Sequence, residues 1–271
     1  MSTATNAKSP KHGIPASGTG DVERRLRELA RKYETADFIG GDPVSFAHAA
    51  RSAGGGDANL ETTAFVASAL SYGSRSQFLP KIARICEMAR GDVHHWVARG
   101  GYAADFREGD GRSFYRLFPY GGMRVFFDCL RGVLEDSGTI SAFLKGRGAD
   151  TGPAALEALT GAFAASAPIV PKDTTSACKR LCLFLRWMAR DSSPVDFGIW
   201  SSWFDKRTLV IPLDVHVVRQ ALRMGLTKSP CASMRNALAI TARLRQIFPD
   251  DPLKGDFALY GLGIDLASAE P

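Results

Sequence analysis

The sequence predicts an all-α fold. Apolar residues recur at helical spacing in most segments, while the alternating runs typical of β-strands are few. Strands and helices do not alternate clearly along the sequence, so a parallel sheet is not expected. No internal repeat of fixed length is present. A chain of 271 residues can bury a large core, so we expect one large domain or two lobes around a shared core.

The elements at the start of the chain differ in character. Residues 1–20 are rich in Ser, Thr, Gly and Pro, and we expect them to form a disordered tail. Asp21 is a candidate N-cap, and the apolar spacing after it predicts a helix over 21–34. Residues 37–57 are repeatedly interrupted by Gly and Pro, so we expect them to be irregular.

The rest of the chain is dominated by segments with one apolar face. Pro80 lies early in the second of them, and proline is tolerated in the first turn of a helix. Residues 195–202 form a short, mostly apolar piece. The predicted helical segments are 59–73, 74–92, 121–138, 141–146, 152–167, 173–192, 213–224, 232–247 and 251–262.

The composition is that of a globular protein with an excess of positive charge. The net charge is +6, and 45% of the residues are hydrophobic. A basic balance favours a polyanionic partner but does not decide the fold, so a basic protein without such a partner remains an alternative. No apolar run reaches the roughly 18–20 residues that a membrane helix requires, and we expect no membrane contact.

The five cysteines are scattered and odd in number, which favours a reducing compartment such as the cytoplasm. Cys178 and Cys182 are spaced to share one face of a helix. No second pair of Cys or His residues with ligand spacing completes a zinc or iron–sulfur site nearby. We therefore predict core cysteines, without a metal ion or an iron–sulfur cluster.

Asp214 lies where a helix is expected to begin, within "TLVIPLDVHVVRQALRMGL" (208–226). Pro212 favours extended geometry before it, and Gly225 ends the apolar helical face that follows. Two interpretations remain open. The carboxylate caps the helix, or the backbone donors there keep it ionised so that it stabilises a developing cation or activates water.

The candidate partner of Asp214 is Lys179, in "SACKRLCLFLRWMAR" (176–190). An apolar stripe on this helix faces away from a second stripe formed by Lys179, Arg186 and Arg190. The simpler interpretation is a solvated basic face. The alternative is a helix that lines a groove for a polyanion, with a lysine in its first turn that acts as an amine nucleophile.

These two segments resemble the helix-hairpin-helix DNA glycosylase superfamily. "VIPLDVHVVRQALRMGL" resembles the segment that carries its catalytic aspartate, and "CKRLCLFLRWM" resembles the helix that carries the lysine of bifunctional members. Asp214 follows Lys179 by 35 positions (214 − 179), closer to the archaeal 8-oxoguanine glycosylase branch than to the common 8-oxoguanine glycosylases. The whole chain is most similar to an uncharacterised bacterial family that shares "FLRWM", "DFGIW", "PLDVH" and "DFALYGLG".

The resemblance extends to the loop between two earlier helices. "ETTAFVASALSYGSRSQFLPKIARI" (61–85) is similar to the helix pair whose loop probes the DNA lesion, which implies DNA contacts by Tyr72, Ser74 and Arg75. The superfamily's hairpin usually reads Leu-Pro-Gly-x-Gly before the lysine, whereas this chain reads "PKDTTSAC" without glycine. Its polar residues are then expected to cap the helix and present N–H groups to a phosphate; they are Thr174, Thr175 and Ser176.

Further site residues are assigned on the same basis. The resemblance implies DNA contacts by Arg180, Arg186 and His216, although a packed histidine is an alternative for the last. Phe197 and Trp200 would stack on an extruded base, with core packing as the alternative. The superfamily's iron–sulfur loop after the last helix is absent from this sequence.

The resemblance implies a fold of two helical lobes with a central cleft. Residues 59–204 would form an inserted lobe with the lysine, and residues 21–58 together with 205–268 the other lobe. Double-stranded DNA would bind a monomer without any cofactor. Lys179 would attack C1′ of a nucleotide with an oxidised purine such as 8-oxoguanine, and Asp214 would stabilise the oxocarbenium-like transition state.

Two alternatives to this base-excision repair function remain at the level of the sequence. The first is a non-catalytic DNA- or RNA-binding protein on the same scaffold, in which Lys179 and Arg186 only hold phosphates. The second is an enzyme that cleaves free nucleosides or RNA.

Overall fold

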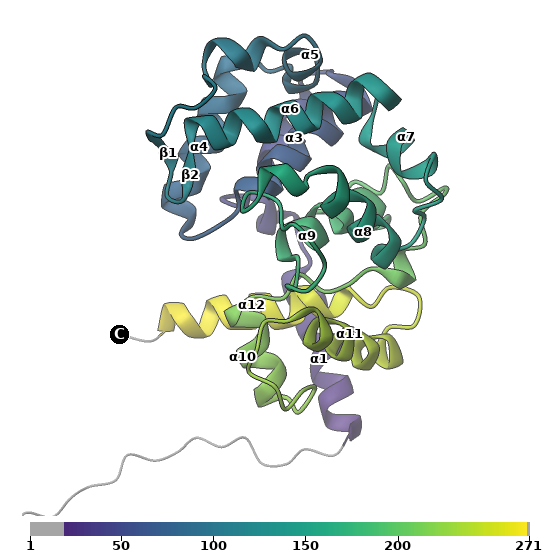
Figure 1. The fold of residues 1–271 in the computed structure, drawn as a ribbon. Coiled ribbons are helices and arrows are strands. Elements are labelled where there is room, and N and C mark those ends of the chain that lie inside the picture. Colours follow the sequence, from purple (N-terminus) through teal and green to yellow (C-terminus); the bar gives the residue numbers. More distant parts are fainter. Residues whose placement is uncertain (1–18, 270–271) are drawn as a thin grey trace, which may run out of the picture.

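The computed structural model describes residues 19–269, which form a mostly helical protein and confirm the predicted all-α fold (Figure 1). Within residues 19–269, four short 3-10 helices occur between the α-helices: η1 (Ala36–Ile39), η2 (Gly101–Ala104), η3 (Ala164–Ser166) and η4 (Lys206–Thr208). The strands β1 (Ser113–Tyr115) and β2 (Phe118–Pro119) pair as an antiparallel hairpin that the sequence pattern did not predict. The α-helices are α1 (Thr19–Tyr33), α2 (Val44–Ser52), α3 (Gly56–Leu70), α4 (Arg75–Met88), α5 (Val93–Ala98), α6 (Tyr120–Ser137), α7 (Ile140–Lys145), α8 (Gly152–Ala162), α9 (Lys179–Ala189), α10 (Val215–Arg223), α11 (Met234–Ile247) and α12 (Lys254–Ala269).

The N-terminal region departs from the prediction in two places. The first helix begins at Thr19 rather than after Asp21, and the predicted tail over 1–20 otherwise lies outside the described residues. Residues 37–57 are not irregular, because they include most of η1 and all of α2. The Asp42 carboxylate accepts the Val44 backbone N–H at 3.1 Å, so Pro43 and the glycines mark the limits of a short helix whose first N–H binds a side chain.

The position of Pro80 and the start of α9 also differ from the prediction. Pro80 lies in the second turn of α4, on an exposed position where water can bind the carbonyl that proline leaves free. Helix α9 begins at Lys179 rather than near residue 173, because Cys178 before it has a left-handed backbone, with φ of 46°. The start of α9 is thus set by one strained residue that carries no recognisable helix-start signal.

Helix α3 is the centre of the upper group of helices in Figure 1. Its residues from Asn59 to Leu70 are all buried, and α2, α4, α5 and α9 pack against it. The hydroxyls of Thr62 and Ser68 each donate to a carbonyl of the same helix at 2.9 Å, so these buried polar groups are satisfied locally.

Glu61 connects α3 to two later segments. Its carboxylate accepts the backbone N–H groups of Ile140 at 2.7 Å and Ser141 at 3.1 Å, which begin α7. It also accepts the indole N–H of Trp200 at 2.8 Å. Burial raises the pKa of Glu61 to about 7, while these three donors favour its charged form.

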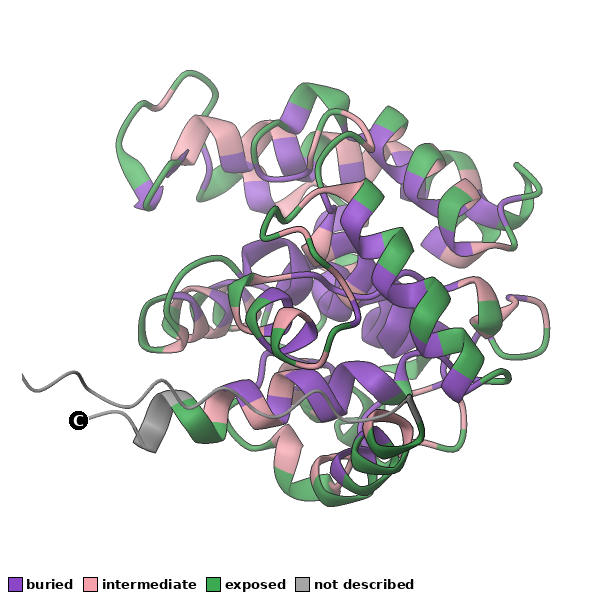
Figure 2. Cartoon of the chain, turned by 90° about the horizontal axis from the view of Figure 1, so that it is seen from below, coloured by how far each residue is buried: buried purple, intermediate pink, exposed green. Residues whose placement is uncertain are grey.

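Helices α1 and α10 pack against α12, and together with α11 they lie below the group built on α3 (Figure 1). Buried side chains from both groups form one continuous core, and in Figure 2 the buried residues lie on the inner faces of the helices. Helix α2 packs against α3. The proposed division of the chain into lobes at residues 58 and 204 stays a prediction.

Candidate functional site

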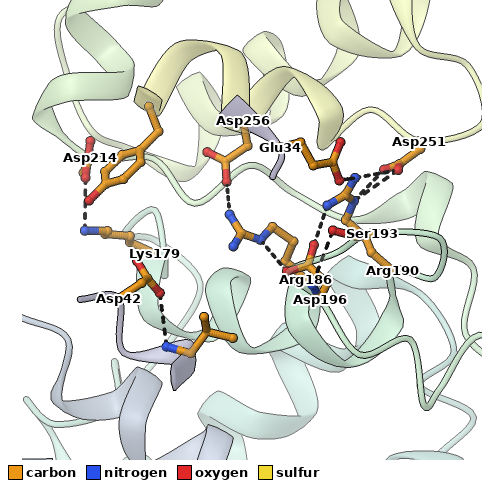
Figure 3. A network of polar contacts seen from close by, with 12 residues as sticks. Glu34, Asp42, Lys179, Arg186, Arg190, Ser193, Asp196, Asp214, Asp251 and Asp256 are labelled. Atoms are coloured by element: carbon orange, nitrogen blue, oxygen red, sulfur yellow. Dashed lines mark hydrogen bonds and ion pairs between the residues drawn. The ribbon is translucent and has the colours of Figure 1, made fainter. Parts of the chain in front are cut away.

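Lys179 and Asp214 form an ion pair between the starts of two helices. Lys179 Nζ lies 3.1 Å from Asp214 Oδ2, and the two side chains face each other in Figure 3. Asp214 is the N-cap of α10, and its Oδ1 accepts the backbone N–H groups of His216 at 2.9 Å and Val217 at 3.0 Å. One oxygen therefore caps the helix while the other binds the lysine, so the capping role does not exclude a chemical role.

A cavity of about 380 Å³ opens beside this ion pair. Its volume is within the range of roughly 300–1,000 Å³ that is usual for small-molecule sites. Six of the predicted site residues line it: Lys179, Asp214, Ser74, Arg75, Arg186 and His216. The fold thus brings the candidate lysine, the candidate aspartate and part of the predicted lesion-probing loop around one space.

Several other lining residues were missed by the sequence analysis, among them Phe38, Asp42, Asp256 and Tyr260. Asp256 lies within "DFALYGLG", where an acid precedes an apolar helical stretch. An acid at the start of an otherwise largely apolar helical stretch was the available signal. Nothing in the local sequence connects Phe38 or Asp42 with α9 or α10.

Arg75 connects three sides of the cavity. Its Nη2 donates to Asp42 Oδ2 at 3.2 Å and to the Tyr260 hydroxyl at 3.0 Å, and its guanidinium lies over the Tyr260 ring. Burial raises the pKa of Asp42, and burial also raises the pKa of Tyr260 to about 12. The Tyr260 hydroxyl therefore stays protonated at neutral pH and can donate a hydrogen bond into the cavity.

Arg186 forms the inner wall of the cavity within a buried ion-pair network (Figure 3). Its Nε lies 3.2 Å from Asp196 Oδ1, and its Nη1 lies 2.6 Å from Asp256 Oδ2. Burial raises the pKa of Asp256 to about 6, although the neighbouring guanidinium opposes this shift. Arg190 extends the same network, with contacts to Asp196, Asp251 and Glu34.

The predicted basic stripe on α9 is therefore wrong for two of its three members. The side chains of Arg186 and Arg190 are 3% and 0% exposed, so neither can reach a DNA phosphate at the surface. Their acidic partners come from α12, from the residue that follows α1, and from the segments that precede α12 and follow α9. The helical wheel of α9 does not reveal these partners.

Arg180 and Tyr72 lie outside the cavity lining. Arg180 donates to the carbonyls of Ala69 and Pro168, both at 2.8 Å, and burial lowers its pKa to about 10. Both terminal nitrogens thus bind the protein itself, which opposes the predicted DNA contact of Arg180. Tyr72 is 40% exposed, and the guanidinium groups of Arg116 and Arg180 lie near its ring.

The segment before Lys179 does not cap α9 as predicted. Asp173 accepts the backbone N–H of Thr175 at 3.0 Å, and Ser176 forms an isolated bridge with Ser233. Cys178 occupies the N-cap position without a side-chain cap. Thr174, Thr175 and Ser176 lie in a turn ahead of the helix and do not line the cavity.

Phe197 and Trp200 do not form a base pocket. Phe197 packs against the ring of His48, with centroids 4.4 Å apart, and Trp200 is 1% exposed. The Trp200 ring contacts Phe184 and other aromatic rings, and its N–H is bound to Glu61. The interpretation of both as core aromatics fits their positions, since neither lines the cavity.

Residues 19–269 contain no group of three or more His, Cys, Asp or Glu side chains placed to hold a metal ion. None of the helices in that range is long and apolar enough to span a bilayer. Cys178 and Cys182 are both buried, as expected for core cysteines.

Fold and site together define an all-α protein with a Lys–Asp ion pair at the edge of a cavity lined by both polar and apolar side chains. Residues 42–265 match the DUF2400 family, described as protein of unknown function, and the chain belongs to that family. No curated protein and no solved structure matches the chain.

Proposed function

We propose that this protein is a DNA N-glycosylase with AP lyase activity that removes an oxidised purine, such as 8-oxoguanine, from double-stranded DNA. The observation that carries the proposal is the distance of 3.1 Å between Lys179 Nζ and Asp214 Oδ2 beside a cavity of about 380 Å³. A lysine and a carboxylate in contact, next to a space of that size, match the groups that the resemblance to bifunctional DNA glycosylases requires.

The position of the pair supports chemistry on an extruded nucleotide. A base inside a duplex is inaccessible, so enzymes that act on it rotate the nucleotide into a pocket. Lys179 and Asp214 stand at helix starts, and Ser74 and Arg75 of the predicted lesion-probing loop line the same cavity. A base in the cavity would place its sugar near the ion pair.

The proposed reaction assigns one role to each member of the pair. The bond between C1′ and the base nitrogen breaks, and its electron pair leaves with the base, which takes up a proton. The positive charge on C1′ and the ring oxygen is stabilised by the carboxylate of Asp214. The Lys179 amine, after it has passed a proton to Asp214 or to the leaving base, bonds to C1′.

Strand cleavage would follow from the same adduct. Ring opening converts the adduct into a protonated Schiff base between Lys179 and C1′. Loss of a proton from C2′ then expels the 3′ phosphate by β-elimination, and hydrolysis of the Schiff base restores the amine. No metal ion takes part in these steps.

A trapping experiment tests the proposal. The protein is incubated with labelled duplexes that carry 8-oxoguanine, uracil or an abasic site, in the presence of borohydride, which reduces a Schiff base to a stable covalent product. We expect a trapped band that is lost in Lys179→Gln. We also expect base release to fall roughly a hundredfold or more in Asp214→Asn, because the carboxylate that stabilises the transition-state charge is gone.

The matched control is Lys172→Gln, which removes an exposed lysine in the loop before α9 that does not line the cavity. We expect this variant to give the same borohydride-trapped protein–DNA band as the wild type. Base release that requires Asp214 without any trapped band would indicate a monofunctional glycosylase. DNA binding that weakens steeply with salt, without base release or a band on any substrate, would instead support the non-catalytic binding protein.

A further inference from the structure

Arg186 has a donor that the ion-pair network leaves unused. Its Nε and Nη1 bind Asp196 and Asp256, but its Nη2 has no hydrogen-bond partner among the described residues although it is buried. Buried donors in proteins are almost always paired, so one that remains free calls for an explanation. Arg186 lines the cavity, and in Figure 3 its third nitrogen points away from Asp196 and Asp256.

The orientation of this donor is fixed before any ligand arrives. The guanidinium is planar, and two of its three nitrogens are held by carboxylates on different elements. The Phe257 ring covers one face, with Arg186 Cζ 4.4 Å from its centroid. The free Nη2 is therefore a rigid donor at the inner wall of the cavity rather than a mobile side chain.

The acidic and basic side chains that line the cavity balance. Asp196 and Asp256 contact the Arg186 guanidinium directly, and Arg75 pairs with the buried Asp42. The lining carries the carboxylates of Asp42, Asp214 and Asp256 and the cations of Arg75, Lys179 and Arg186. The cavity therefore has no excess positive charge to select an anion, and a neutral heterocycle fits it.

The same wall offers an acceptor beside the donor. Asp256 lines the cavity and is bound to the neighbouring nitrogen of Arg186, at 2.6 Å. A donor next to an acceptor complements a group in which a carbonyl adjoins a ring N–H. Oxidised and 6-oxo purines carry this lactam edge, and the unsubstituted purine ring does not.

We propose that Arg186 is a specificity-determining residue, which donates from Nη2 to the carbonyl oxygen of a lactam-bearing base while Asp256 accepts the adjacent ring N–H. This assignment rests on the proposed function, since it identifies the cavity as the base pocket. It replaces the phosphate contact that the sequence predicted for Arg186. It also gives the pocket a polar inner wall, in place of the stacking pair expected at Phe197 and Trp200.

Binding of free bases tests the assignment without requiring catalysis. Thermal unfolding of the full-length protein is followed with millimolar hypoxanthine, which has a lactam edge, and with millimolar purine, which has none. We expect hypoxanthine to raise the melting temperature several-fold more than purine does, because only hypoxanthine satisfies the donor and the acceptor together. Equal shifts, or no shift with either base, would overturn the assignment.

Two variants refine the test. Arg186→Lys keeps the positive charge but lacks the planar fork, so the difference between hypoxanthine and purine should disappear. Arg190→Lys makes the same exchange in a neighbouring buried arginine that does not line the cavity, and the difference should persist. If both variants lose the difference between the hypoxanthine and purine shifts, the loss would reflect a general loosening of the buried ion-pair network and would overturn the specific role of Arg186. If neither variant folds, the wild-type comparison alone decides.

The outcome is separable from that of the proposed function. Trapping on an abasic duplex involves no base, so it reports on Lys179 and Asp214 without Arg186. A trapped band together with equal melting-temperature shifts from hypoxanthine and purine would refute the role of Arg186. The proposed lyase activity would still be supported. A selective hypoxanthine shift without trapping or base release would retain the base pocket and refute the glycosylase.

Discussion

The ammonium of Lys179 and the carboxylate of Asp214 meet at 3.1 Å although each belongs to the start of a different helix. Asp214 uses its other oxygen to cap α10. One side chain thus combines a structural contact with a contact to the candidate nucleophile, and its two roles can be separated by mutation.

The capping role of Asp214 predicts a difference between two substitutions. Asp214→Ala removes the acceptor for two backbone N–H groups, and the free energy of unfolding should fall by about 1 kcal/mol. Asp214→Ser restores an N-cap oxygen and should recover most of that loss, while base release stays as low as in the alanine variant. Urea unfolding and a base-release assay measure the two effects. Recovery of base release by serine would contradict the proposed role of the carboxylate.

The buried Glu61 predicts a pH-dependent stability. Burial raises its pKa from 4.5 in the unfolded chain to about 7 in the folded protein, so the folded state binds more protons between these values. Its contribution is fully present below pH 4.5 and is lost as the pH rises through 7, by on the order of 3 kcal/mol.

The check on Glu61 is the difference between the wild type and Glu61→Gln, measured by urea unfolding from pH 4.5 to 7.5. Glutamine has one oxygen to accept three N–H donors, so the variant should be less stable throughout this range. The stability difference between the two proteins should shrink as the pH rises. A difference that does not change with pH would show that Glu61 does not titrate in this range.

The ion-pair network around Arg190 predicts a large loss of stability when its centre is removed. Arg190→Met leaves Asp196, Asp251 and Glu34 without their shared partner, and breaking a buried pair in this way costs roughly 3–5 kcal/mol. Denaturant unfolding measures the loss. Arg84→Met, which breaks an exposed pair with Glu87, should change stability little. Similar effects of the two substitutions would refute the importance of burial here.

The contact between α1 and α12 predicts opposite effects for two glycine substitutions. A Cβ at position 261 would lie 2.2 Å from Tyr33 Cγ, so Gly261→Ala should destabilise the protein by about 1–3 kcal/mol through overpacking. Gly132 lies within α6 with open space where a methyl group would be added, and Gly132→Ala should stabilise by roughly 0.5–1 kcal/mol. Melting temperatures of both variants check the two signs, and a neutral Gly261→Ala would mean that the helices separate at little cost.

Local patterns in the sequence were sufficient for part of this description. The spacing of apolar residues predicted most of the helices, because one buried face is a property of each helix alone. The N-cap position of Asp214 followed from its immediate neighbours. The short helix α2 and the start of α9 were not predicted, since a capping contact from Asp42 and a left-handed Cys178 decide them.

The sequence by itself determined the helical class, the cap at Asp214 and the order in which Lys179 and Asp214 occur. Only the tertiary structure decided that these two residues meet, and that Arg186 lies inside the protein rather than on a basic surface. The reason is physical: periodicity and capping act within a few residues, whereas burial and ion pairing depend on segments far apart in the chain. The acids that surround Arg186 come from a loop after α9 and from α12, so no helical wheel of α9 contains them.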